Sequence, residues 1–196
     1  MLEFEKKIML WEDEYRFLKE RCYSSGKTTV QINHYYDTDG FELDHQGITC
    51  RIREENGICI ATVKEHHLKG SDCSTETSRI VKNRYDDTLF RDMDIRYQGS
   101  LETTRSVCSG RHGIKIALDK NCYLGIVDYE IEIEYDLNHE ALASAELDSV
   151  ISDLTESGIL KDPSEFKSRI CHSRNKASRF FSRKAEVREK IKRWMT

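Results

Sequence analysis

Three glutamates stand at every second position in the segment YEIEIEY, residues 129–135. If this segment is a β-strand, successive side chains point to opposite faces, so Glu130, Glu132 and Glu134 share one face. Carboxylate oxygens are the ligands that hard cations such as Mg²⁺ and Mn²⁺ prefer. The pattern therefore indicates a metal-binding wall. Without a cation, we expect the crowding to raise the pKa of at least one of these carboxylates.

The first residues repeat this pattern. In the segment LEFEKKI, Glu3 and Glu5 fall on one face of a predicted strand together with Lys7, and apolar side chains mark the other face. This acidic face is distant in sequence from Glu130, Glu132 and Glu134, yet it also presents carboxylates at every second position.

Cationic side chains alternate in the same way in two central segments. Arg51 and Arg53 share a face in CRIRE, and Thr62 and Lys64 share a face in IATVK. Guanidinium groups bind phosphate oxygens through paired hydrogen bonds, and a lysine adds a point charge. A polyphosphate that a metal ion links to the acidic faces satisfies both kinds of strand.

Two arrangements of these charged faces remain open. An antiparallel sheet with one face in water has the same alternation, and its charges then have no special role. Blocks of a single sign argue against it, because a solvated face normally mixes signs to avoid repulsion. The alternative is a barrel with a charged interior, in which acids and cations face each other across a wet tunnel, with helices outside.

The order of the predicted elements favours an α+β fold with an eight-stranded antiparallel β-barrel and flanking helices. The turn residues EENG separate two of the strands and predict a hairpin. The predicted strands are 2–10, 28–38, 47–54, 57–64, 74–81, 100–108, 113–119 and 123–136. Helices are predicted over 12–22, 84–94, 139–158, from Pro163 to about residue 180, and from about residue 184 to the end.

The composition is that of an ordinary folded domain. Of its 196 residues, 38% are hydrophobic and 34% are charged, which allows a core without disulfides. No apolar run approaches the roughly 18 residues of a membrane span, and we do not expect the charged N-terminus to be a signal peptide. Seven cysteines without a C-x-x-C pair argue against a disulfide framework or a zinc site. We therefore expect reduced thiols and a cytoplasmic protein.

The net charge of −4 is unevenly distributed. Residues 167–196 contain eleven Lys and Arg and only two acids, Glu186 and Glu189. Such a tail can bind nucleic acid, but no stacking aromatics at regular spacing accompany it, so nucleic acid is not an expected partner. We expect instead a basic helix that docks on an acidic body. The chain then divides into a tunnel domain, residues 1–181, and a basic C-terminal helix, residues 182–196, that packs on this domain or extends it.

The ordered set of these segments resembles the CYTH domain family, also called the triphosphate tunnel metalloenzymes. EFEKK is similar to the family's E-x-E-x-K signature, and NHYYDT, CRIRE, IATVK, IALD and DYEIEIEY follow in the family's order. SRNKASRFF is similar to the segment of the helix that plugs one tunnel mouth. The resemblance covers residues 2 to about 181 and implies an eight-stranded antiparallel barrel with a polar tunnel.

The resemblance also implies roles for individual residues. The implied metal ligands are Glu3, Glu5, Glu130 and Glu132, with Asp119 as an additional ligand and Glu134 as a further one if tunnel depth allows. The implied phosphate-binding residues are Lys7, Arg51, Arg53, Lys64, Arg105 and Lys176. Glu3, Glu5, Lys7, Glu130 and Glu132 form the implied catalytic set, Glu76 pairs with the cations, and Arg179 is a weaker match to the plug segment.

Several of these positions have a structural alternative. Arg105, in TTRSV, fits an outward-facing strand residue, and Asp119 fits a turn residue. Motif register alone selects Lys176 over Arg174. His34, in NHYYDT, is a structural strand residue rather than a base.

The activity that the resemblance implies is hydrolysis of a triphosphate with Mg²⁺ or Mn²⁺. The substrate is inorganic triphosphate or an organic one, such as thiamine triphosphate or a nucleotide. The family's class IV adenylyl cyclases carry a His-Phe-containing motif with a nearby proline, and HYYDTDGFEL lacks that proline, which disfavours a cyclase. A non-catalytic polyphosphate- or nucleotide-binding module is the third alternative, although the full acidic set favours catalysis. The oligomeric state, a homodimer included, is left open.

Overall fold

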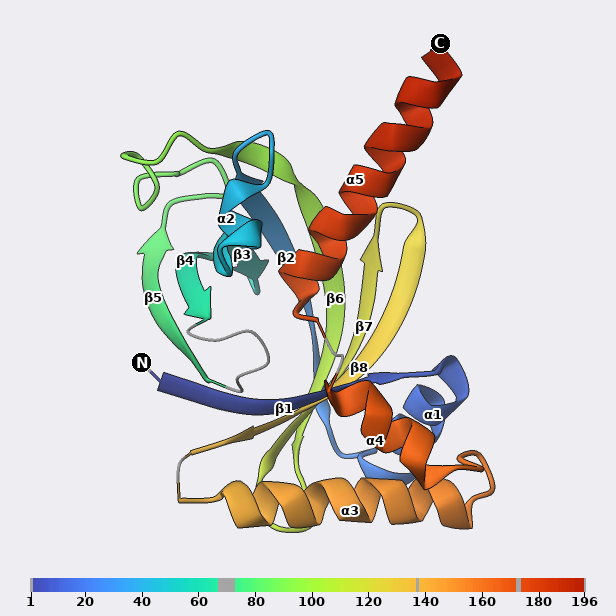
Figure 1. The fold of residues 1–196 in the computed structure, drawn as a ribbon. Helices are drawn as coiled ribbons and strands as arrows, with labels where there is room; N and C mark the ends of the chain where they lie inside the picture. The colour runs from blue at the N-terminus through green and yellow to red at the C-terminus, as the bar shows by residue number, and fades with distance from the viewer. Residues whose placement is uncertain (1, 67–72, 137, 172–173, 196) are drawn as a thin grey trace.

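Eight antiparallel strands form a closed barrel in the order β1-β5-β4-β3-β2-β6-β7-β8 (Figure 1). The computed structural model describes residues 2–66, 73–136, 138–171 and 174–195. The strands are β1 (Leu2–Leu10), β2 (Lys27–Asp37), β3 (Ile48–Glu55), β4 (Ile58–His66), β5 (Cys73–Val81), β6 (Arg96–Ser109), β7 (Lys115–Tyr123) and β8 (Ile126–Tyr135). The predicted α+β fold with an eight-stranded antiparallel barrel is confirmed.

The barrel closes through a short contact. β1 pairs with β8 over Phe4–Leu10, whereas it pairs with β5 only where Leu2–Phe4 meet Cys73–Thr75. In the described part of the chain, the segment Glu76–Val81 of β5 pairs with β4 alone, so its other edge is open.

Two tight turns set the register of the hairpins. Asn56 and Gly57 join β3 to β4 with positive φ values of 51° and 76°, as a two-residue hairpin turn of this kind requires. The hairpin predicted from EENG is therefore confirmed. Leu124 and Gly125 join β7 to β8 in the same way, with φ values of 44° and 77°. Consequently β7 runs on to Tyr123, and its predicted end at residue 119 is wrong.

The hydrophobic core lies outside the barrel. The helices are α1 (Glu12–Phe17), which continues as the π-helix η1 (Leu18–Cys22), α2 (Glu42–His45), α3 (Glu140–Glu156), α4 (Pro163–Cys171) and α5 (Lys176–Met195). In Figure 1, α3 and α4 lie below β1 and β8. There Ile131 and Ile133 of β8 pack with Val150, Leu154 and Phe166 in one buried cluster. The apolar face of YEIEIEY therefore faces the helices, which leaves its acidic face inside the barrel.

Residues 84–94 form turns rather than the predicted helix. Polar side chains compete with helical hydrogen bonds there, because Asp86 accepts from the Lys82 amide and Asn83 accepts from the Tyr85 amide. Phe90 packs from this segment against Ile52 and neighbouring residues on the outer face of the barrel.

Helix α5 closes one end of the barrel interior. Phe180 and Phe181, in its first turns, contact the ring of Tyr35. A side chain at Gly99, which has a φ of 139°, would place its Cβ 2.7 Å from the Phe180 ring, so the close approach requires glycine. The far end of α5 projects away from the barrel (Figure 1).

The predicted helix boundaries near the C-terminus are wrong. One helix was expected from Pro163 to about residue 180 and another from about residue 184, but α5 runs unbroken from Lys176 to Met195. The break lies earlier, where the Asn175 side chain accepts a hydrogen bond from the Ser178 amide at 2.8 Å and caps the new helix.

No helix in the described ranges is long and apolar enough to cross a lipid bilayer. Among the cysteines whose side chains are described, Cys22, Cys50, Cys59, Cys108 and Cys122 are free thiols.

Candidate functional site

A cavity of about 350 Å³ lies inside the barrel, and charged side chains of both signs line it. Ten of the residues predicted from the sequence contribute to the lining: Glu5, Lys7, Arg51, Arg53, Lys64, Glu76, Arg105, Glu132, Glu134 and Lys176. Asp119 and Glu130 are fully buried and contact this set. Glu3 belongs to β1, but its side chain lies outside the described part of the structure. The charged faces thus enclose a cavity, and the open solvated sheet is excluded.

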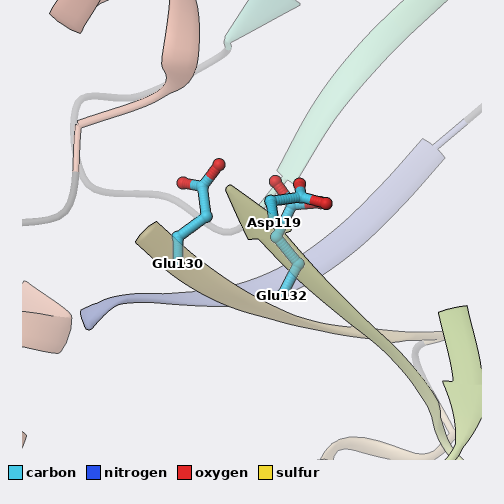
Figure 2. Close-up of side chains that lie close together, drawn as sticks. All are labelled: Asp119, Glu130 and Glu132. Carbon is cyan, nitrogen blue, oxygen red and sulfur yellow. The ribbon is translucent and has the colours of Figure 1, made fainter. Parts of the chain in front are cut away.

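Three carboxylates converge at one wall of the cavity. Asp119, Glu130 and Glu132 bring carboxylate oxygens within 4.8 Å of one another, and Figure 2 shows them side by side. Asp119 and Glu130 are cross-strand neighbours in β7 and β8, so Asp119 is an interior strand residue and not a turn residue. The exposed fractions of the three residues are 0, 0 and 4%. Three buried anionic oxygen donors fit a hard divalent cation.

Lys176 places its ammonium among these carboxylates. Its Nζ lies 2.8 Å from Asp119 Oδ2 and 2.6 Å from Glu132 Oε1, and it also pairs with Glu130. Lys176 is the first residue of α5, so the helix that closes the barrel also supplies this charge. Arg174 instead donates to Ser182 on the surface.

Two further cations meet the acidic wall. Arg105 donates from Nη2 to Asp119 Oδ2 at 2.6 Å and pairs with Glu132 as well, so its side chain faces the cavity and not the outside. Lys7 Nζ lies 3.1 Å from Glu132 Oε1 and 3.0 Å from Glu5 Oε1. Glu132 is therefore the point at which cations from β1, β6 and α5 meet.

These cations decide the ionisation of the acidic wall. Burial raises the pKa of Glu132, but Arg105 and Lys176 outweigh it and hold the pKa well below its ordinary value. Burial likewise raises the pKa of Glu130, and Lys176 and Arg179 lower it by more. Burial also raises the pKa of Glu5, and Lys7, Lys64 and Lys176 together lower it by more. The expected rise in a carboxylate pKa is therefore wrong, since the protein itself supplies the counter-charge.

The wall opposite β8 is cationic and short of anions. Arg51 and Arg53 lie on β3, which faces β8 across the closed barrel. Burial and repulsion from Arg51 and Arg105 lower the pKa of Arg53 to about 9, so it stays charged at neutral pH. The Arg53 Nε donates to the Asn33 amide oxygen at 3.0 Å, and the Arg51 Nη2 lies 3.9 Å from the Glu76 carboxylate.

Buried donors at this wall have no acceptor within the described part of the chain. They are Asn33 Nδ2, Tyr35 OH and Arg51 Nε. Burial raises the pKa of Tyr35, so its hydroxyl keeps the proton that it can donate. An unsatisfied buried donor costs about 1–3 kcal/mol, and an anion with several oxygens would satisfy all three.

Neither Asn33 nor Tyr35 was expected at the site. Asn33 lies opposite Arg53, and Tyr35 lies opposite Arg51, in the register of β2 against β3. Their alternation in NHYYD was visible in the sequence, but the strand pairing that brings them to the arginines was not. His34, between them, lies on the other face, with its Nε2 3.7 Å from Glu54.

Arg179, which is a weak match to the plug segment, pairs with two carboxylates of β8. Its Nε lies 2.9 Å from Asp128 Oδ2 and its Nη1 lies 3.0 Å from Glu130 Oε2. Arg179 therefore ties the second turn of α5 to β8, beside the contacts of Lys176.

Comparison with known proteins agrees with this geometry. A family model described as the CYTH domain matches residues 1–163. YjbK of Bacillus subtilis, named as a candidate triphosphatase, is 35% identical over 147 residues, which are 68% of this chain and 77% of that protein.

Two solved structures have similar folds. One is a candidate adenylate cyclase from Bacillus halodurans, with a TM-score of 0.65 and 27% identity, covering 91% of this chain and 97% of that chain. The other is HpAC1 from Hippeastrum, described as a candidate adenylyl cyclase with a dominant triphosphatase activity. It has a TM-score of 0.60 and 19% identity, covering 85% of this chain and 95% of that chain.

Proposed function

Because the chain belongs to the CYTH domain family, we propose that it is a metal-dependent hydrolase of triphosphate compounds. One observation carries the proposal. Three buried carboxylates converge on one wall of the cavity, while the opposite wall has buried donors that find no acceptor among the described residues. A triphosphate is the kind of ligand that needs both walls, because it presents many oxygens to donors and shares a divalent cation with carboxylates.

We infer that Glu5, Asp119, Glu130 and Glu132 hold Mg²⁺ or Mn²⁺, and we keep Glu3 and Glu134 as further proposed ligands. When bound, such an ion offsets negative charge on phosphoryl oxygens and lowers the pKa of coordinated water. The buried triad supports this assignment, because its carboxylates are close together and the pKa values of Glu130 and Glu132 are lowered.

The cationic residues bind and align the phosphates in this proposal. Arg51 and Arg53 have few anionic partners, so they gain most from an added anion. The remaining phosphate-binding residues are Lys7, Lys64, Arg105 and Lys176, with Glu76 as their supporting partner. Tyr35 donates its free hydroxyl to a phosphoryl oxygen. Positioning for in-line attack and electrostatic stabilisation then supply the catalysis, with no covalent intermediate on the protein.

The functional unit extends into helix α5. Lys176 contacts Asp119 and Arg179 contacts Glu130, so a barrel that ends before α5 lacks two cations that pair with the acidic wall. We therefore keep residues 1–181 as the proposed tunnel domain and residues 182–196 as its helical extension.

A panel of substrates tests the proposal. Purified protein is incubated with tripolyphosphate, thiamine triphosphate or ATP in Mg²⁺, Mn²⁺ or chelator, and phosphate, pyrophosphate and cyclic AMP are followed. We expect metal-dependent release of phosphate from at least one triphosphate. Cyclic AMP with pyrophosphate would instead establish a cyclase, the activity named for the Bacillus halodurans protein. Calorimetric binding of tripolyphosphate without any turnover would establish a binding module.

A further inference from the structure

The interior face of β4 and β5 changes from charged to apolar toward one end of the barrel. Lys64 lies opposite Glu76 in the register of these strands, and both line the cavity. Two residue pairs further along the same face, Ile60 lies opposite Ile80, and beyond Ile60 stands Ile58, the first residue of β4. Because side chains alternate with a period of two, these isoleucines stand on the face that carries the cavity residues.

These three side chains are exposed although they stand on the interior face. The exposed fractions are 36% for Ile60, 74% for Ile80 and 52% for Ile58. A single exposed isoleucine is ordinary, but neighbouring apolar side chains that share one concave face are typical of a ligand-binding surface.

The apolar row begins where the phosphate-binding wall ends. Arg53 lies opposite Ile60 in the register of β3 against β4, so these two side chains are cross-strand neighbours. A ligand whose phosphates contact Arg53 therefore has Ile60 and then Ile80 as its next surface.

The structure leaves room for a bulky group at this end. A surface hollow of about 750 Å³ begins at Ile80, and the exposed Tyr85 ring lines it. The open edge of β5 borders the same region, because β1 does not pair with this part of β5. Two cations, Arg79 and Lys82, and one carboxylate, Asp86, also line the hollow, so the lining has a net positive charge, which disfavours a cationic occupant.

We propose that Ile60 and Ile80 bind the organic part of the substrate, and that this part is a flat, uncharged heterocycle such as the base of a nucleoside triphosphate. This inference rests on the proposed function, since it takes Arg53 as a phosphate-binding residue. It favours a nucleoside triphosphate over inorganic triphosphate, which has nothing to place on the isoleucines. It also favours a nucleoside triphosphate over thiamine triphosphate, whose thiazolium ring is cationic.

The test compares substrates in the double variant Ile60→Thr/Ile80→Thr. Threonine keeps the branched Cβ that suits a strand but replaces apolar surface with a hydroxyl. Val30→Thr is the matched control, because Val30 is 51% exposed and lies on the outer face of β2. We expect kcat/KM for ATP to fall about tenfold more than kcat/KM for tripolyphosphate, the scale of a lost methylene contact in an apolar pocket. The control should change both values equally.

Calorimetric affinities for ATP and tripolyphosphate in Ca²⁺ provide a second readout that needs no turnover. An unchanged ratio of the two affinities, and of the two kcat/KM values, would overturn the inference while leaving the triphosphatase intact. If the protein hydrolyses no triphosphate but the wild type still binds ATP in preference to tripolyphosphate and the variant does not, the proposed activity is wrong and the proposed subsite stands. A shift from dimer to monomer in light scattering, with unchanged ratios, would show that the isoleucines cover a second copy, and the inference would be wrong.

Discussion

The Nζ atom of Lys176 lies 2.6 Å from the Glu132 carboxylate, inside the group of acids that fits a divalent ion. An ammonium in that position neutralises the acids when no metal is present. A metal ion bound by the same oxygens must share them with Lys176 or displace it. Metal binding and the docking of the first turn of α5 are therefore expected to influence each other.

Replacement Lys176→Met tests this competition. We expect a lower melting temperature in chelator, because breaking a buried ion pair costs about 3–5 kcal/mol. Mn²⁺ should then raise the melting temperature of the variant by more than that of the wild type, since no ammonium competes for the oxygens. Thermal shift assays in chelator and in Mn²⁺ measure both effects. Arg174→Met, an exposed position on the same approach to α5, is the control. An equal metal response in variant and wild type would contradict the competition.

The affinity for triphosphate should depend on Arg53. Arg53→Ala is expected to weaken the binding of tripolyphosphate by about 1.5–3 kcal/mol, the scale of a charge-assisted hydrogen bond. Isothermal titration calorimetry at neutral pH measures this loss. Arg16→Ala, on the exposed surface of α1, removes the same charge far from the cavity and should leave the affinity within error. If the two variants bind alike, Arg53 is not a phosphate-binding residue.

The faces of individual strands could be predicted because alternation is a local property of the chain. Glu132 and Arg53 both point into the cavity, as the period of two in their segments indicated. The relation between strands could not be read in this way. Tyr35 reaches the site through the register of β2 against β3, and Arg105 reaches Asp119 through the register of β6 against β7. Those registers depend on turns and on packing across the whole barrel.

The helix errors have local physical causes. At residues 84–94, Asn83 and Asp86 bind backbone amides and favour turns over a helix. Near the C-terminus, continuous helical periodicity concealed the break, which the Asn175 cap creates. Tertiary contacts reinforce that break, because Lys176 must start a new helix in order to reach Glu132 inside the barrel.

The stability that the ion pairs of the acidic wall contribute should be lost only below about pH 4.5. The pKa values of Glu5, Glu130 and Glu132 are lowered from their ordinary value of 4.5, so their ion pairs contribute fully above that pH. The contribution disappears as the pH falls through the lowered pKa values of the folded state. On the alkaline side, the pKa of Lys7 is raised from 10.5, although burial opposes the rise, because Glu132 and Glu5 favour its charged form. Its contribution is lost only as the pH rises above 10.5.

Melting temperatures measured across this pH range test the prediction. In Glu132→Gln, the melting temperature should depend less on pH below about 4.5, because the variant lacks the carboxylate with the most cationic contacts. The lowered pKa of buried His34 predicts a separate loss of stability below pH 6.5, which Glu132→Gln should leave unchanged. A large loss between neutral pH and pH 5 that Glu132→Gln removes would contradict this account of the acidic wall.

The response to metal should require the glutamates of β8. In the wild type, Mg²⁺ or Mn²⁺ is expected to raise the melting temperature, and tripolyphosphate should raise it further when the metal is present, because both bind the folded state. Glu130→Gln/Glu132→Gln should lose the metal response and metal-dependent hydrolysis, since an amide is a weaker ligand for a hard cation than a carboxylate. Glu102→Gln/Glu156→Gln, which alters two exposed carboxylates, should keep both. Circular dichroism establishes that the variants are folded. Identical metal responses in all three proteins would mean that the inward glutamates of YEIEIEY serve only to balance the cations of the barrel.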